Sequence, residues 1–434
     1  MLTLALCSHS SGLAGAERML LNLALLLERS GAVHPVLLAP GEGALAQAAR
    51  RQGLHSEIYP APPWYLLLPR SMDDYRRGVE ECCRTLQQML VDLNSDAVLI
   101  NTLTSVPAML AAVELELPSL LWVHGVIDSM LLPERSSEFA VPHDELLLHA
   151  ATRVIALPNY TGDFCARVMR RTNLDIIPNW TPVDPHFTVP AEKYRSRRIA
   201  CLNTFDPHKG HATLLRAAAL LKAGNVPFEL HLYGDGAILD ETRRRAEALG
   251  LQDHVRFQGR TNHVNEVYDQ ALCVVNPADA EPFPMTLLEP MARKTPVVAT
   301  RCGGPSEIVV DGQSGYLVDR GDAAALADRL RALLESPELA QRLGEGGHAR
   351  ICERYREAAA RAAFVPVIEQ AAADFRGYEP AVKTLAKFYR LWLAPPGSGP
   401  VTRETDTAWT ARVTRMAKRG LRRLLHFRAG RVEG

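Results

Sequence analysis

The segment that decides the fold runs from Leu272 to Ala299 and reads LCVVNPADAEPFPMTLLEPMARKTPVVA. Its two ends, Leu272–Val275 and Pro296–Ala299, are short apolar runs of the kind found in strands that are buried on both faces of a parallel sheet. Between them, a loop that ends with Pro282 and Pro284 leads into a helical pattern, because proline is tolerated in the last loop positions and first turn of a helix. The segment therefore predicts a strand, a helix and a second parallel strand.

The same alternation of apolar runs and helical patterns extends through most of the chain. Strands that alternate with helices form βαβ units, so we predict an α/β fold with helices on both faces of parallel sheets. The stretch 178–185 holds three prolines, which disfavour regular structure, and it separates two sets of strands. The predicted strands are Leu2–Cys7, His34–Ala39, Ala97–Ile100, Ser119–Val123, Arg153–Leu157 and Leu174–Ile177, and then Arg198–Leu202, Glu229–Tyr233, Val255–Gln258, Leu272–Val275, Pro296–Ala299 and Gly315–Val318.

This pattern divides the chain into four regions. Residues 1–178 are predicted to form an N-terminal Rossmann-like domain and residues 179–355 a second one. Two helical patterns, roughly 357–373 and 379–393, make up a region at 356–393. Residues 394–434 form a tail that begins with a Pro- and Gly-rich break.

Composition excludes several classes of protein. The 434 residues carry 49 basic and 49 acidic side chains, so bulk charge does not favour a nucleic-acid partner. The apolar fraction of 47 % is ordinary for a soluble globular protein, and no run of eighteen apolar residues predicts a membrane-spanning helix. The eight cysteines have no CxxC spacing, which argues against a zinc site and suggests buried free thiols in the cytoplasm.

The tail differs from the rest of the chain in charge. From Arg403 onward there are nine basic and three acidic residues. On a helical wheel, residues 409–428 place apolar and basic side chains on opposite faces, a pattern typical of a helix lying on an anionic membrane surface. The alternative is a helix packed on the protein with a solvated basic face. The apolar set is Trp409, Val413, Met416, Leu424 and Phe427, and the basic set is Arg412, Arg415, Lys418, Arg419 and Arg422.

Two features of the first domain follow predicted strands. The turn after Leu2–Cys7 contains Gly12 and Gly15 and leads into a helix, the arrangement by which Rossmann-like folds bring backbone N–H groups to a phosphate. The GxGxxG pattern is absent, so a tight turn without a ligand is the alternative. His124 follows Ser119–Val123, at the strand end where open α/β sheets bind ligands, although a lone histidine is more often structural.

The second domain has three comparable positions. Lys209 precedes a predicted helix, where a cation beside free N–H groups favours a diphosphate, and a solvated surface lysine is the alternative. Glu281 and Glu289 lie at the start of another helix. Two carboxylates there can accept hydrogen bonds from sugar or ribose hydroxyls while the N–H groups bind phosphate. Simple complementarity to the helix dipole explains them equally well.

In their order and spacing, these motifs resemble glycosyltransferase family 4, the retaining group 1 glycosyl transferases of GT-B fold. The family's second domain has a glutamate, seven residues, a second glutamate, a Pro-Val-Val-Ala strand and Gly-Gly-x-x-Glu. The resemblance covers about residues 1–355. The matching positions are Glu281, Glu289, Pro296–Ala299 and Gly303–Glu307, with Gly15–Glu17, His124, Pro178-Asn179, Lys209-Gly210, Tyr233–Gly236 and Gly312–Tyr316.

The resemblance implies a fold and a reaction. Two Rossmann-like domains would face each other across a cleft, and the helices at 356–393 would cross back to the first domain. The reaction would be metal-independent transfer of a sugar from a nucleoside diphosphate, with retention of anomeric configuration. No cofactor or metal is expected besides this donor, which would be of the UDP or GDP type.

The resemblance also implies roles for individual residues. Glu281 would bind hydroxyls of the transferred sugar, Lys209 would neutralise the diphosphate leaving group, and His124 would contact the donor sugar or assist at the transition state. Glu289 would bind the ribose. The other expected contacts are Thr204, Gly234, Arg260, Phe283, Pro284, Met285, Thr286 and Leu287 for the donor, and Gly12 and Gly15 for the acceptor or a phosphate.

Two positions depart from the family pattern. Thr204 stands where the family usually has an arginine, which leaves Arg260 or another residue to supply the second cation. Pro284 replaces a glycine and has no N–H group, so one phosphate donor is lost. Both departures concern the donor and leave the two carboxylates and Lys209 in place.

We therefore predict a hexosyltransferase-type enzyme of polysaccharide biosynthesis, located in the cytoplasm and, through its tail, at the inner face of the membrane. Its acceptor would be a hydroxyl of a glycan, a lipid-linked sugar or a small molecule. A catalytically inactive homologue that binds a nucleotide or a partner as a regulatory module is the main alternative. An NAD-dependent oxidoreductase would be expected to have GxGxxG, and a sugar-nucleotide epimerase of the same fold would need no acceptor.

Overall fold

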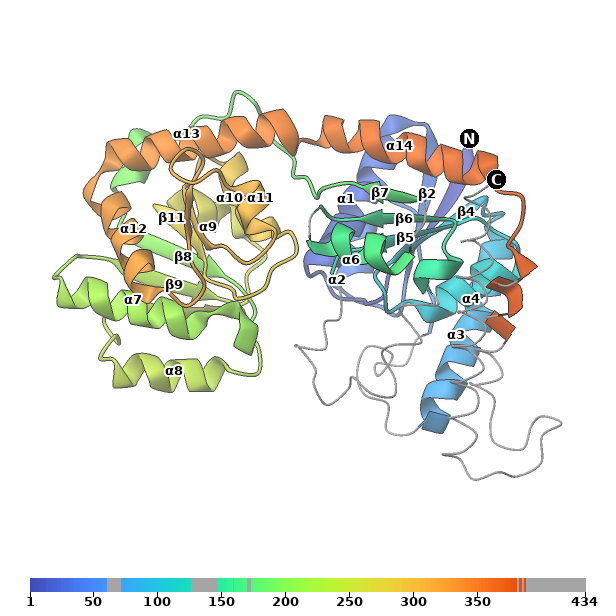
Figure 1. Ribbon diagram of the computed structural model, residues 1–434, viewed down its shortest axis with the longest axis horizontal. Coiled ribbons are helices and arrows are strands. Elements are labelled where there is room, and N and C mark those ends of the chain that lie inside the picture. Colours follow the sequence, from blue (N-terminus) through green and yellow to red (C-terminus); the bar gives the residue numbers. More distant parts are fainter. Residues whose placement is uncertain are drawn as a thin grey trace. The chain divides into compact units, whose positions relative to one another are not determined.

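A computed structural model of the chain describes residues 1–60, 72–125, 147–158, 160–169, 173–380, 382–384 and 386–387. These residues form two compact units (Figure 1). Unit 1 contains residues 1–156, 161–177 and the chain from Arg361 onward. Unit 2 contains residues 157–160 and 178–360, so the chain leaves unit 1 after Ile177 and returns to it at Arg361.

Unit 1 is built on a seven-stranded sheet in the order β3-β2-β1-β4-β5-β6-β7, and neighbouring strands are parallel. The order runs outward from β1 in both directions, which is the doubly wound arrangement expected of a Rossmann-like domain. The strands are β1 (Leu2–Cys7), β2 (Val33–Ala39), β3 (Ser56–Ile58), β4 (Ala97–Asn101), β5 (Ser119–Val123), β6 (Arg153–Ala156) and β7 (Leu174–Ile176). The helices are α1 (Gly15–Ser30), α2 (Ala44–Arg51), α3 (Met72–Asp92), α4 (Val106–Glu114) and α6 (Tyr160–Met169).

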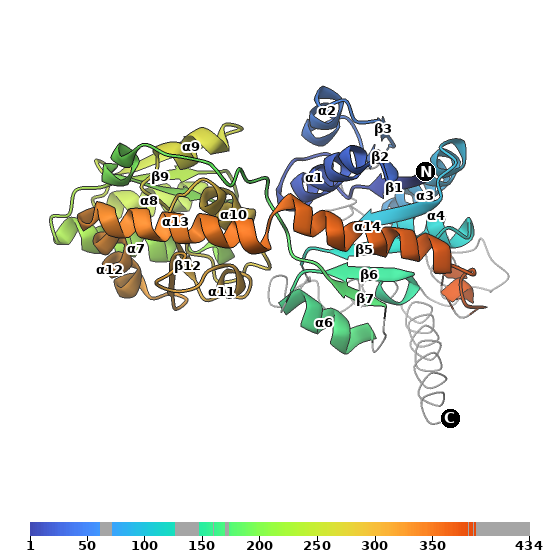
Figure 2. The ribbon, with the colours of Figure 1, turned by 90° about the horizontal axis from the view of Figure 1, so that it is seen from above.

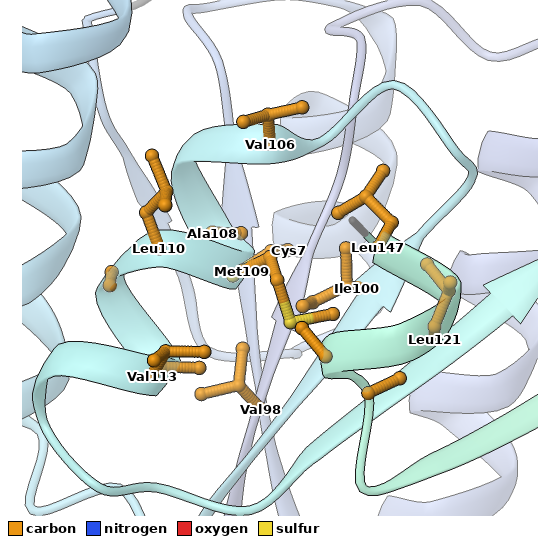
Figure 3. Packing of buried hydrophobic residues seen from close by; sticks show 14 of the residues in the cluster. Cys7, Val98, Ile100, Val106, Ala108, Met109, Leu110, Val113, Leu121 and Leu147 are labelled. Carbon is orange, nitrogen blue, oxygen red and sulfur yellow. The ribbon is translucent and has the colours of Figure 1, made fainter. Parts of the chain in front are cut away.

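The core of unit 1 on one face of the sheet lies beneath α3 and α4. Alternate strand residues such as Val98 and Ile100 belong to this core, together with Met109 and Leu110 of α4 (Figure 3). All four side chains are buried, as continuous apolar strands in a sheet covered on both faces require.

The helix α14 (Glu357–Asp374) joins this unit from the far end of the sequence (Figure 2). Its Phe364 ring packs edge-on against Trp122 of β5, with 4.9 Å between ring centroids, and both rings are fully buried. Further along, Tyr378 donates a hydrogen bond to the Ser119 hydroxyl at 2.7 Å. The first predicted C-terminal helix therefore does pack on the N-terminal sheet, and most of the second lies outside the described residues.

Unit 2 repeats the plan with a six-stranded parallel sheet in the order β10-β9-β8-β11-β12-β13. The strands are β8 (Arg198–Leu202), β9 (Glu229–Tyr233), β10 (Val255–Gly259), β11 (Cys273–Asn276), β12 (Val297–Thr300) and β13 (Tyr316–Val318). The helices are α7 (His211–Ala223), α8 (Leu239–Ala248), α9 (Val264–Gln270), α10 (Met285–Ala292), α11 (Pro305–Ile308), α12 (Ala323–Glu335) and α13 (Pro337–Arg354), with short 3₁₀ turns at Ala191–Arg195 and Pro207–Lys209.

Every predicted strand is present within two residues of its expected bounds, and the α/β class is confirmed. One strand, β3, was not predicted, because it is a three-residue edge strand whose half-buried side chains give no apolar run. The eight cysteines are free thiols, and six of them are buried. In the part of the chain described here, no helix is both long and apolar enough to cross a membrane.

Candidate functional site

The clearest cluster of charged groups in unit 2 joins Lys209 to Glu281. Lys209 follows β8, and Glu281 follows β11, the strand next to β8 in the sheet. Carboxyl ends of adjacent parallel strands meet at one edge, which brings together two residues that are 72 positions apart. The Lys209 ammonium lies 2.5 Å from the Glu281 carboxylate, and the side chains are only 17 % and 11 % exposed.

Glycines let the loops that carry this pair approach each other closely. Gly210 has a φ of +71°, and a Cβ atom there would lie 1.8 Å from the Pro277 carbonyl oxygen. A Cβ atom on Gly304 would lie 2.1 Å from the Pro282 carbonyl oxygen, and its N–H group donates to Glu281 O at 2.9 Å. The protein's own backbone therefore requires both glycines, and they fix the position of Glu281.

Helix α10 begins at Met285, three residues after Pro282. Its N-cap residue is Pro284, which provides no side-chain cap. The Leu287 N–H donates to the Pro284 carbonyl at 3.1 Å, so the N–H groups of Met285 and Thr286 are the ones that can bind an anion. Glu289 in the second turn accepts a hydrogen bond from the Tyr268 hydroxyl at 2.8 Å. The Phe283 carbonyl accepts one from the Asn179 side chain at 3.1 Å, so the linker holds the start of α10 in place.

The remaining predicted donor residues are distributed over the same edge of the sheet. Gly234 has a φ of +137°, and a Cβ atom there would lie 2.0 Å from the Asn203 carbonyl oxygen, so it is also required by the chain itself. Thr204 is exposed and donates to Asp206 at 2.6 Å. Arg260 is 80 % exposed and 3.8 Å from Asp235, which leaves its long side chain able to reorient towards a ligand.

The predicted donor contacts Met285, Thr286 and Leu287 are the first three residues of α10. Met285 and Leu287 are buried, and the Thr286 hydroxyl accepts from Asn276 at 3.1 Å. Beside them, burial raises the pKa of the Cys302 thiol to about 11, so this thiol is protonated at neutral pH and is a poor nucleophile. Within the described ranges, no group of three or more His, Cys, Asp or Glu side chains is arranged to hold a metal ion.

In unit 1, His124 lies at the carboxyl end of β5, as predicted. Its Nε2 atom is 2.9 Å from the Asn101 side-chain oxygen, and its ring lies 4.3 Å from that of Trp122. Burial, and secondarily the nearby His9, lower the pKa of His124 to about 3. His124 is therefore a neutral imidazole in the folded protein at neutral pH.

Sequence reasoning missed the pairing of His9, in the turn after β1, with Glu17 in the first turn of α1. His9 Nε2 lies 3.2 Å from the Glu17 carboxylate, and the side chains are 15 % and 5 % exposed. Gly12 donates its N–H to the Ser10 hydroxyl at 3.0 Å, whereas a Cβ atom on Gly15 would meet nothing within 4 Å. His9 and Asn101 could have been found from sequence, because each sits at or just after the end of a predicted strand, as His124 does.

Residues 185–350 match the family model described as "Glycosyl transferases group 1". This part of unit 2 is therefore similar to the group 1 glycosyl transferase domain. It contains Lys209, Glu281 and Glu289, so the three residues that carried the resemblance lie inside the matched region. The basic tail at 394–434 lies outside the described residues.

The curated proteins similar to this chain include several named as glycosyltransferases. The lipopolysaccharide core biosynthesis glycosyltransferase LpsE of Rhizobium meliloti is 30 % identical over 216 residues, covering 50 % of this chain and 57 % of that relative. The phosphatidyl-myo-inositol mannosyltransferase of Mycobacterium leprae is 33 % identical over 179 residues, covering 39 % of this chain and 47 % of that relative. The chain thus spans about half the length of these relatives.

Solved structures extend the similarity over both units. HepE of Anabaena, solved in complex with UDP-glucose, has a TM-score of 0.71 at 20 % identity and covers 86 % of this chain and 100 % of its own. Sucrose-phosphate synthase from Thermosynechococcus elongatus has a TM-score of 0.71 at 21 % identity, with 86 % and 100 % coverage. At this identity the likeness shows the fold, so the predicted GT-B class is confirmed.

Proposed function

We propose that this protein is a retaining glycosyltransferase that moves a sugar from a nucleoside diphosphate donor to a hydroxyl group of its acceptor, without a metal ion. The observation that carries the proposal is the Lys209–Glu281 pair, held beside the uncapped start of α10 inside the group 1 domain. A cation and backbone N–H groups suit a diphosphate, and a carboxylate suits sugar hydroxyls.

The proposed role of each side chain follows from where negative charge develops during the reaction. Transfer breaks the bond between the sugar's anomeric carbon and the diphosphate, so negative charge grows on the leaving phosphate oxygen. The Lys209 ammonium and the first N–H groups of α10 stabilise that charge, the task that a metal ion has in other transferases. Glu281 accepts hydrogen bonds from the transferred sugar, and Glu289, oriented by Tyr268, accepts them from the ribose.

Uridine diphosphate is the donor nucleotide that we propose. The similar HepE structures were solved with UDP, with UDP and glucose, and with UDP-glucose. The acceptor that we propose is an intermediate of polysaccharide or lipopolysaccharide assembly, since LpsE and its R. meliloti relative LpsD are named for lipopolysaccharide core biosynthesis. The amphipathic basic pattern at 409–428 would hold the enzyme at an anionic membrane surface where such acceptors are found.

The test measures nucleotide release from UDP-glucose, UDP-N-acetylglucosamine and GDP-mannose, with and without EDTA. We expect release from at least one UDP-sugar, unaffected by EDTA, and lost in Lys209→Met. Proton NMR of the product anomer tests retention. Binding of nucleotides without turnover of any donor, in the presence of a broad panel of glycoside acceptors, would support the inactive regulatory homologue instead.

A further inference from the structure

A buried lysine contacts the carboxyl end of the helix that carries Glu289. Lys193, in the 3₁₀ turn Ala191–Arg195, is only 7 % exposed. Its ammonium donates to the Arg293 carbonyl at 3.0 Å and to the Thr295 hydroxyl at 2.8 Å, just after the last residue of α10. A cation at this end complements the helix dipole, so Lys193 stabilises α10. The roles proposed for the donor site do not use this lysine.

Hydrogen bonds between buried groups connect the lysine to Glu289. The Thr295 hydroxyl accepts from Lys193, so its own proton is donated, and the shorter of its two carbonyl contacts is to Tyr268 O at 2.9 Å. The Tyr268 hydroxyl in turn donates to the Glu289 carboxylate at 2.8 Å. Tyr268 and Thr295 are both fully buried. Three hydrogen bonds and the side chain of Tyr268 therefore join the lysine to the carboxylate.

The charge of Lys193 depends on its surroundings in unit 2. Burial lowers the pKa of Lys193 from 10.5 to about 8, while Asp269 opposes this shift and Arg293 adds to it. Asp269 of α9 and Arg293 themselves form an ion pair at 2.5 Å. Helix α13 also packs against the 3₁₀ turn, and its Glu345 acts on Tyr194. Lys193 is therefore mostly charged at pH 7 and mostly neutral at pH 9, where its two hydrogen bonds lose their charge assistance.

Glu289 has to keep one orientation if it is to distinguish ligands by their hydroxyl groups. An unrestrained glutamate loses rotamer freedom when it binds a ligand, and this loss lowers the affinity. The Tyr268 hydroxyl already restrains the Glu289 carboxylate in the free protein. Thr295 and Lys193 hold the backbone of Tyr268 and the end of α10, so the orientation of Glu289 depends on buried residues at some distance from the ligand.

We propose that Tyr268, Thr295 and Lys193 are positioning residues that hold Glu289 ready for the hydroxyl groups of the donor ribose. This role rests on the proposed function, in which Glu289 accepts hydrogen bonds from the ribose. The preference for a ribonucleotide is then determined by a network that extends to the carboxyl end of α10. Binding of the diphosphate, which uses Lys209 and the start of α10, does not depend on this network.

Calorimetry on the full chain tests the network by comparing UDP with 2′,3′-dideoxy-UDP, which lacks both ribose hydroxyls. Inorganic pyrophosphate, as a third ligand, reports on the diphosphate site. At pH 7 we expect the native protein to bind UDP at least about tenfold more tightly than the dideoxy nucleotide, because hydrogen bonds to a charged group are strong. Tyr268→Phe removes only a hydroxyl, so this preference should fall below about threefold. Its pyrophosphate affinity should keep the native value, which also shows that the variant is folded.

Two matched pairs of variants follow the network beyond Tyr268. Thr295→Val should lower the preference for UDP, and Thr295→Ser, which keeps the hydroxyl, should retain it. Lys193→Met should lower the preference as well, whereas Lys222→Met, which removes an exposed lysine of the same unit, should not. Between pH 7 and pH 9 the preference of the native protein should fall about threefold, and that of Lys193→Met should stay constant. Both nucleotides carry the same base and diphosphate, so their own titration cancels in the ratio.

The positioning role is refuted if Tyr268→Phe and Lys193→Met keep the native preference, or if they weaken pyrophosphate binding as much as UDP binding. A preference in Lys193→Met that changes with pH as in the native protein would refute it too. Equal native affinity for the two nucleotides would overturn the ribose role of Glu289, and with it the role of the network. Failure of sugar transfer would be seen separately, in the UDP-release assay, so the two failures are distinguishable.

Discussion

Breaking the Lys209–Glu281 pair tests the proposed chemistry most directly. The two charged groups are 2.5 Å apart and their side chains are less than one fifth exposed. Each charge has therefore lost part of its hydration shell and interacts with the opposite charge instead. Removing one partner of a fully buried pair costs about 3–5 kcal/mol. Because both side chains keep some contact with water, we expect Lys209→Met to lower the free energy of unfolding by about 2 kcal/mol.

The effect on turnover should be larger than the effect on stability. Lys209→Met removes a preorganised charge from the leaving diphosphate, and loss of one such contact lowers turnover by about 10²–10³-fold. Glu281→Gln keeps the shape of the side chain but not its charge, and we expect a loss of at least about a hundredfold. In the double variant the unfolding penalties should not add, with a coupling free energy of about 1 kcal/mol.

The assays are urea unfolding for stability and UDP release for turnover. An exposed pair in the same unit, Arg245–Glu241 at 3.5 Å with side chains 48 % and 60 % exposed, supplies the matched control. Arg245→Met should change unfolding by less than about 0.5 kcal/mol and leave turnover unchanged. Near-native turnover in Lys209→Met, or additive penalties in the double variant, would refute this account of the site.

Three further predictions concern the glycines, the histidines and the tail. Gly304→Ala places a Cβ atom 2.1 Å from a backbone oxygen and should cost about 1–3 kcal/mol of stability, whereas Gly15→Ala, which meets nothing within 4 Å, should unfold like the native protein in urea. Burial lowers the pKa of His124 from 6.5 to about 3 and that of His211 to about 4, so below about pH 6.5 the unfolded chain binds protons that the folded chain excludes. As the pH is lowered through this range, the free energy of unfolding should fall by about 1.4 kcal/mol per pH unit for each histidine. A free energy of urea unfolding that does not change between neutral pH and about pH 4.5 would contradict this prediction. Deletion of residues 403–434 should preserve UDP release and weaken co-sedimentation with anionic vesicles, and unchanged sedimentation would count against the membrane role.

Much of the fold follows from local sequence. Buried parallel strands need continuous apolar runs, and these marked β8, β11 and β12 within a residue or so of their observed ends. The edge strand β3 was not predicted, because its side chains are only half buried and do not form a continuous apolar run. Motif order and spacing also placed Lys209, Glu281 and Glu289 in one family pattern, and the match to residues 185–350 bears out that relationship.

The tertiary structure alone determined how those residues are paired. Lys209 and Glu281 meet because β8 and β11 are neighbours in the sheet, an order that no local pattern encodes. The same reason applies to Asn101, which ends β4, and His124, which follows the neighbouring strand β5, since their side chains meet at 2.9 Å. The sequence marked Gly304 only as part of the family pattern at Gly303–Glu307, and the packed backbone showed that the Pro282 carbonyl of the protein's own chain approaches it closely. Side chains far apart in sequence acquire their partners from strand order, so the residue types of this site were predictable and their contacts were not.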